Sequence, residues 1–123
     1  MNASPLSDSF WDYLDKLVDS SLIKIDRPKG TRHPRYPDLV YPLDYGYLEG
    51  TTSADRDGID VWLGASGGHD LVGVVLTVDL NKRDTEIKLL LGCTKAEIQT
   101  IVNFHNEGRY LRAFLVQRPA YPK

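Results

Sequence analysis

The part of the chain best equipped for chemistry is the segment 55–60, which carries three carboxylates within six residues. Asp55, Asp57 and Asp60 repel one another, and burying them would be costly without a compensating positive charge. Mg²⁺ and similar hard cations prefer such oxygen ligands. An EF-hand loop is excluded, because its glycine and terminal glutamate positions would hold Asp60 and Ser66. The segment predicts a metal site, and an aspartate-rich surface turn is the alternative.

A second pair of carboxylates, Asp79 and Asp84, brackets a polar turn between two apolar stretches. The two side chains could face the same side across the mouth of a hairpin. An exposed hairpin tip would also be polar, so the pair alone does not decide. Five aspartates at strand ends suit a site for more than one metal ion.

A basic stretch rich in proline and glycine, residues 26–37, could supply cations for an anionic ligand; we call it the basic flap. With one residue just upstream, its cations are Lys24, Arg27, Lys29, Arg32 and Arg35. Such a stretch can hold little regular structure beyond an edge strand and turns. A solvated loop and an anion-binding flap are both compatible with this composition.

The elements that must position these residues are mostly short strands. Helical spacing predicts a helix over residues 8–18 capped by Ser7 or Asp8, and a capping box of Thr94 and Glu97 opens a second helix that ends near Gly108. Strands are predicted at 22–25, 40–48, 59–63, 71–78, 85–91 and 110–117. We therefore expect a mainly β (α+β) fold: a small OB-like closed five-stranded β-barrel with flanking N- and C-terminal helices.

Length and composition limit the number of domains and the kinds of partner that the chain can have. A length of 123 residues predicts a single domain over 1–123, and a net charge of −2 argues against a nucleic-acid partner. The single cysteine, Cys93, allows no internal disulfide. No apolar run is long enough for a membrane helix, and the acidic N-terminal stretch does not have the pattern of a signal peptide. We expect a cytoplasmic protein without a membrane partner.

The motifs resemble a known family. The run 41–47, Tyr-Pro-Leu-Asp-Tyr-Gly-Tyr, followed by the aspartates of 55–60, is similar to the signature of soluble family I inorganic pyrophosphatases. The Val-Gly-Val run at 72–74 and the five-residue step from Asp79 to Asp84 continue the similarity, which covers residues 40–91. The chain departs from the family's pattern at Gly58, where the family has proline, and at Asp44, where it has asparagine.

The resemblance implies hydrolysis of pyrophosphate, or of a related phosphoanhydride, with several Mg²⁺ ions per site. The metal ligands would be Asp55, Asp60, Asp79 and Asp84. Asp57 would take a proton from the attacking water, and Tyr45 would hydrogen-bond a phosphate oxygen. Phosphate-binding cations would come from Lys24, Arg32, Arg35 and Lys88. Family members are often hexameric in bacteria, so a homo-oligomer is expected.

The phosphate-binding side departs most from the family. Glu86 occupies the position of a family lysine, and Lys88 lies two residues on, on the same strand face. His105 and Asn106 occupy the sequence positions that correspond most closely to a Tyr-Lys pair of the family. One alternative is therefore a non-catalytic protein that binds metal and phosphate on the same fold. An oligonucleotide-binding barrel is a third class, against which the acidic balance counts.

Overall fold

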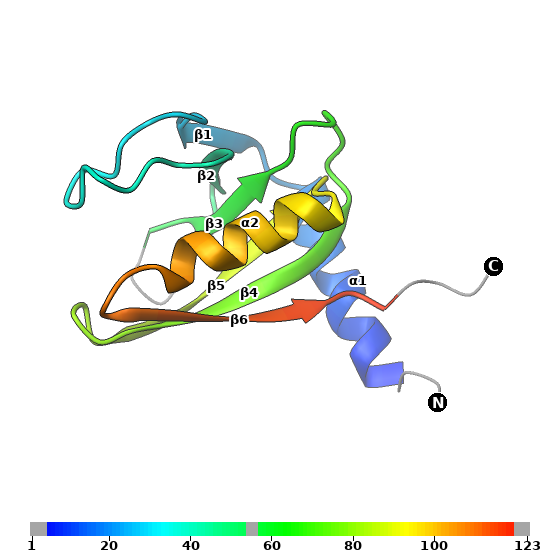
Figure 1. Ribbon diagram of the computed structural model, residues 1–123. Helices are drawn as coiled ribbons and strands as arrows, with labels where there is room; N and C mark the ends of the chain where they lie inside the picture. The colour runs from blue at the N-terminus through cyan, green and yellow to red at the C-terminus, as the bar shows by residue number, and fades with distance from the viewer. Residues whose placement is uncertain (1–4, 54–56, 120–123) are drawn as a thin grey trace.

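The structure is a computed structural model that describes residues 5–53 and 57–119 (Figure 1). Its elements are α1 (Pro5–Asp19), β1 (Ile23–Arg27), β2 (Asp44–Leu48), β3 (Ile59–Leu63), β4 (Leu71–Asp79), β5 (Asp84–Leu91), α2 (Lys95–Asn106) and β6 (Leu111–Gln117). The strands form one sheet in the order β1-β2-β3-β5-β4-β6. Strands β3 and β5 run parallel, and the other neighbouring pairs are antiparallel.

The predicted closed five-stranded barrel is wrong, because the sheet is open and has six strands, with β1 and β6 at its edges. In β5, Leu89, Leu90 and Leu91 are all fully buried. Successive side chains of a strand point to opposite faces, so both faces of β5 need an apolar cover. Two helices on opposite faces of the sheet provide this cover, with α2 in front and α1 behind in Figure 1.

Helix α1 covers one face of the sheet with Trp11, Leu14 and Val18, which pack in a cluster with Val61 and Leu89. The predicted helix is confirmed, but its predicted caps are wrong, because the helix begins at Pro5 and includes both cap candidates. Proline suits the first helical position, since its fixed φ is compatible with the helix and its missing N–H would have no partner there. Within the part of the chain described, neither helix is long and apolar enough to cross a membrane.

Helix α2 covers the opposite face, where Ile98 and Ile101 pack in a cluster with Trp62 and Leu90. Its predicted capping box is confirmed. The Thr94 hydroxyl oxygen accepts a hydrogen bond from the Glu97 backbone N–H at 3.2 Å, and the Glu97 carboxylate accepts one from the Thr94 N–H at 2.9 Å. The helix ends at Asn106, before the predicted stop.

Candidate functional site

A row of cross-strand partners brings three of the sequence-predicted side chains, those of Lys24, Asp60 and Lys88, to the face that carries α2. Lys24 of β1 lies opposite Tyr47 of β2, Tyr47 opposite Asp60 of β3, and Asp60 opposite Lys88 of β5. Directly paired residues point to the same face of a sheet. The row therefore places one cation on each side of Asp60.

Lys88 is the centre of this arrangement. Its side chain is only 7% exposed, and its ammonium donates to Asp60 Oδ2 at 2.8 Å, to the Tyr45 hydroxyl at 2.7 Å and to Glu86 Oε1 at 3.2 Å. Burial alone would lower the pKa of Lys88, but Tyr45, Asp60 and Glu86 together raise it above its usual value. Lys88 is therefore a permanent positive charge at neutral pH, and its three protons are directed at partners within the protein.

Tyr45 completes the same cluster. Its hydroxyl donates to Asp60 Oδ2 at 2.8 Å, so the proton that the sequence reasoning directed at a phosphate is directed at Asp60. Burial raises the pKa of Tyr45, which keeps the phenol protonated. Its ring packs edge-on against Trp62, with 4.7 Å between ring centroids. The side chain is held on both sides and positions the Asp60 carboxylate.

Arg27 is a cation of this face that the sequence reasoning did not select as a site residue. A β-bulge in β1 puts Ile25 opposite Gly46 and Arg27 opposite Tyr45, so that Asp26 has no partner on β2. Without the bulge, an aspartate would have faced Tyr45. The composition of 26–37 indicated a basic segment, but the bulge that puts Arg27 opposite Tyr45 leaves no signal in the sequence.

The Arg27 guanidinium joins the site through Tyr41. It donates to the Tyr41 hydroxyl and lies 5.5 Å from the centroid of that ring. Burial opposes its charge, but the hydrogen bond to Tyr41 and the nearby Asp26 raise the pKa of Arg27. The Tyr41 and Tyr45 rings are 5.3 Å apart, so a continuous chain of contacts runs from Arg27 to the lysine cluster.

The predicted pair Asp79 and Asp84 lies at the end of the same face. The two residues are direct cross-strand partners at the β4–β5 turn. Asp79 Oδ1 accepts hydrogen bonds from the N–H groups of Asn81 and Lys82, at 2.9 and 3.0 Å, and so stabilises the turn. Asp84 Oδ2 is 3.8 Å from the Lys82 ammonium, whereas its Oδ1 is buried and has no hydrogen-bond partner among the described residues. A buried carboxylate oxygen of this kind fits contact with a cation.

The other predicted residues are less closely gathered. Asp55 lies outside the described residues. Asp57 is exposed at the start of the segment that leads into β3. Arg32 and Arg35 are exposed in the basic flap, where the Arg32 guanidinium donates to the Pro37 carbonyl at 2.9 Å.

The flap nevertheless reaches the acidic end of the sheet. The Tyr36 hydroxyl accepts a hydrogen bond from Asn81 Nδ2, at 3.2 Å, in the β4–β5 turn. Flap residues that are distant in sequence from Asp79 and Asp84 therefore lie beside the turn that these two aspartates flank.

Whether Mg²⁺ fits depends on the carboxylate considered. Within the described residues, no three carboxylate, imidazole or thiol groups converge as a metal site. Asp84 fits, because it has a buried oxygen without a partner. Asp60 does not fit as well, because its Oδ2 already accepts from Lys88 and Tyr45.

His105, at the position that resembles part of the family's Tyr-Lys pair, belongs to the core. It is buried, and its Nε2 accepts a hydrogen bond from Trp62 Nε1–H at 3.0 Å. Burial, and secondarily the charge of Lys88, lower the pKa of His105 to about 3. The imidazole is therefore neutral at physiological pH and supplies no cation for a phosphate.

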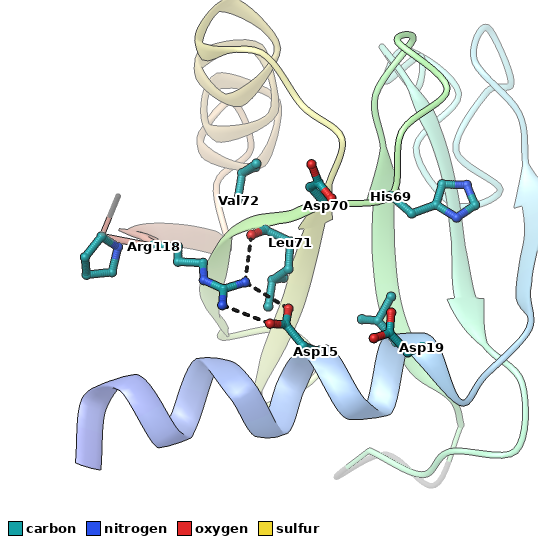
Figure 2. A pocket seen from close by; sticks show the side chains of 9 residues that line it. Asp15, Asp19, His69, Asp70, Leu71, Val72 and Arg118 are labelled. Atoms are coloured by element: carbon teal, nitrogen blue, oxygen red, sulfur yellow. Dashed lines mark hydrogen bonds and ion pairs between the residues drawn. The ribbon is translucent and has the colours of Figure 1, made fainter. Parts of the chain in front are cut away.

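A hollow of about 550 Å³ lies elsewhere, between α1 and the start of β4 (Figure 2). Its wall includes Asp15, Asp19, His69, Asp70 and Arg118. The Arg118 guanidinium donates to both oxygens of Asp15, at 2.8 and 2.9 Å, so this charge is paired within the wall. None of the sequence-predicted site residues lines this hollow. We place the candidate site on the α2 face, because the predicted residues Lys24, Asp60, Asp79, Asp84 and Lys88 lie there.

No protein family matches the chain, and no curated protein does. Among solved structures, an inorganic pyrophosphatase from Neisseria gonorrhoeae is similar, with a TM-score of 0.46 and 16% sequence identity, over 75% of this chain and 71% of that one. A similarity of this extent assigns neither a fold family nor an activity. The function must therefore be argued from the site.

Proposed function

We propose that this protein hydrolyses pyrophosphate, or a closely related phosphoanhydride, at the α2 face of the sheet. One observation carries the proposal: a single sheet face combines the row Lys24, Asp60 and Lys88 with the Asp79–Asp84 pair at its end. A phosphoanhydride needs cations around its oxygens and carboxylates that hold a metal ion and activate water. The resemblance of the aspartate motif to family I inorganic pyrophosphatases adds to this argument.

The roles follow from position and chemistry. Mg²⁺, when bound, would neutralise phosphate charge and lower the pKa of the attacking water. Asp84 would hold it through its unpaired oxygen, with Asp79 beside it and Asp55 assigned by the motif. Asp57 would accept a proton from the water, which requires a carboxylate that solvent reaches.

Phosphate oxygens would be held by cations from β1 and from the basic flap, because these residues border the acidic face. Arg27 is the most firmly positioned of them, since its guanidinium is fixed against Tyr41. Lys24 is exposed on the row of cross-strand partners, and Arg32 and Arg35 are exposed in the flap. These three side chains would move toward phosphate when it binds, at a cost in side-chain entropy.

The decisive experiment measures phosphate release from pyrophosphate with Mg²⁺ and with chelator, for wild type and for Asp57→Asn. The substitution keeps the size of the side chain and removes its basicity, so turnover should fall by about 10²-fold or more. Asp19→Asn, at the end of α1, is a matched control that should keep wild-type turnover. Unchanged turnover in Asp57→Asn, or no release by wild type, would refute the proposal.

A second candidate is a protein that binds metal and phosphate without turnover. Two observations favour it: the Asp60 carboxylate is already paired with Lys88, and Glu86 stands where the family has a lysine. Calorimetric titration of pyrophosphate with Mg²⁺ would separate the candidates. Binding without phosphate release would support this second function and exclude the first.

Self-association, also expected from the resemblance, remains part of the proposal. Phe10 and Leu17 on α1 are 48% and 38% exposed, although they belong to the same helix as the buried Trp11. Apolar side chains at this exposure are available to a second copy. Light scattering on the purified protein would test for an oligomer, and a monomer at all accessible concentrations would exclude it.

A further inference from the structure

We infer that Lys88 is a built-in cation for Asp60, so that no divalent ion binds at Asp60 and the metal requirement of the site is confined to the Asp84 end. The functional consequence rests on the proposed hydrolysis, whereas the occupation of Asp60 by Lys88 does not. The inference replaces the metal-ligand role that the sequence resemblance implies for Asp60.

The geometry of the ammonium carries the inference. A lysine ammonium has three protons to donate. Lys88 has three acceptors within reach, namely Asp60 Oδ2 at 2.8 Å, the Tyr45 hydroxyl at 2.7 Å and Glu86 Oε1 at 3.2 Å. The first two distances are those of good charge-assisted hydrogen bonds. The side chain therefore occupies the space in front of Asp60 Oδ2 in the way that a bound cation would.

The surroundings oppose displacement of Lys88 by a divalent ion. The Lys88 side chain is only 7% exposed, and it comes from a strand directly paired with that of Asp60. Moving the ammonium away would leave it buried without acceptors, which is strongly unfavourable. A divalent ion at Asp60 Oδ2 would also have to displace the proton that Tyr45 donates to the same oxygen. Repulsion between a retained ammonium and the incoming ion adds to both costs.

Asp84 differs in each of these respects. The Lys82 ammonium is 3.8 Å from Asp84 Oδ2 on a side chain that is 47% exposed, so it can move aside. Asp84 Oδ1 has no hydrogen-bond partner among the described residues. A divalent ion can therefore bind at Asp84 without displacing a buried charge. Substitution of Asp84, but not of Asp60, should therefore weaken metal binding.

The test measures Mn²⁺ binding without substrate, from the electron paramagnetic resonance signal of free Mn²⁺. In the wild-type background, Asp84→Asn should weaken Mn²⁺ binding at least tenfold, and Asp60→Asn should change it less than twofold. Lys88→Met should strengthen binding at least tenfold or add a site, because it opens Asp60 and Glu86 to the ion. Lys16→Met, which removes an exposed lysine on α1, should leave binding unchanged.

Two results would overturn the inference: weakening by Asp60→Asn equal to that by Asp84→Asn, or Lys88→Met protein that binds Mn²⁺ no better than wild type. The comparison of Asp60→Asn with wild type decides the matter even if Lys88→Met fails to fold. Absence of Mn²⁺ binding in wild type would overturn the assignment of a metal to the Asp84 end and count against the proposed function, whereas equal weakening by the two aspartate substitutions would overturn only the role of Lys88. The two failures are therefore distinguishable.

Discussion

Lowering the pH from 7 to 5 should destabilise the protein through one buried side chain, His105. Its Nε2 accepts the Trp62 indole N–H, so this nitrogen cannot carry a proton in the folded state. Burial and the charge of Lys88 lower the pKa of His105 to about 3. In the unfolded chain a histidine titrates near pH 6.5, roughly the value for a solvated imidazole.

The sign and size of the effect follow from linkage. Below pH ~6.5 the unfolded chain binds a proton that folded His105 does not, so the free energy of unfolding falls as the pH falls. The slope approaches about 1.4 kcal/mol per pH unit. Between pH 7 and pH 5 the loss is about 2 kcal/mol, and it continues until the folded state is protonated as well, near pH 3.

Urea unfolding of wild type and His105→Gln at pH 7, 6 and 5 would measure this. Glutamine can still accept the Trp62 hydrogen bond and does not titrate. The stability difference between the two proteins should therefore shift by about 2 kcal/mol in favour of the variant at pH 5. His69→Gln, which removes an exposed histidine, should parallel wild type. Parallel pH profiles for His105→Gln and wild type would refute the reasoning.

Two further substitutions test the backbone that supports the site. A Cβ at Gly46 would lie 1.8 Å from the Lys24 carbonyl oxygen. Gly46→Ala should therefore lower the free energy of unfolding by at least about 3 kcal/mol in denaturant titrations. Gly108→Ala is the control, because a Cβ there would lie in open space, and it should be nearly neutral. Equal stabilities for these two variants would contradict the close packing of β1 on β2. Glu97→Ala removes the carboxylate that closes the capping box and accepts the Ala65 N–H at 3.0 Å, and it should cost about 1–2 kcal/mol. A thermal midpoint equal to that of wild type would show that neither bond contributes.

The local elements could be predicted from the sequence because their signals are local. Helical periodicity predicted α1, and the capping-box pattern of Thr94 and Glu97 predicted the start of α2. The interpretation of Asp79 and Asp84 as facing residues also matches their direct pairing at the β4–β5 turn. In each case the partners are close in sequence, so one short window holds the whole interaction.

The parts that were not predicted depend on long-range contacts. The sheet stays open because its edge strands, β1 and β6, do not pair with each other among the described residues, and strand length or spacing does not encode this. The sequence did hold one unused signal, the continuous run of Leu89, Leu90 and Leu91, which is typical of a strand buried on both faces. The position of Arg27 depends on a bulge, and the capture of Asp60 by Lys88 depends on the strand order.

The Asp60–Lys88 pair also has a consequence for how the chain avoids mispaired sheets. Sliding β5 along β3 by two residues would keep every side chain on its face, but it would put Asp60 against either Glu86 or Leu90. The first register buries two carboxylates together, and the second leaves a carboxylate against an apolar side chain. Strand β4 carries no lysine or arginine over Leu71–Asp79, so it cannot replace β5 beside β3 without leaving Asp60 unpaired. One ion pair thus penalises both the shifted register and the exchanged strand order.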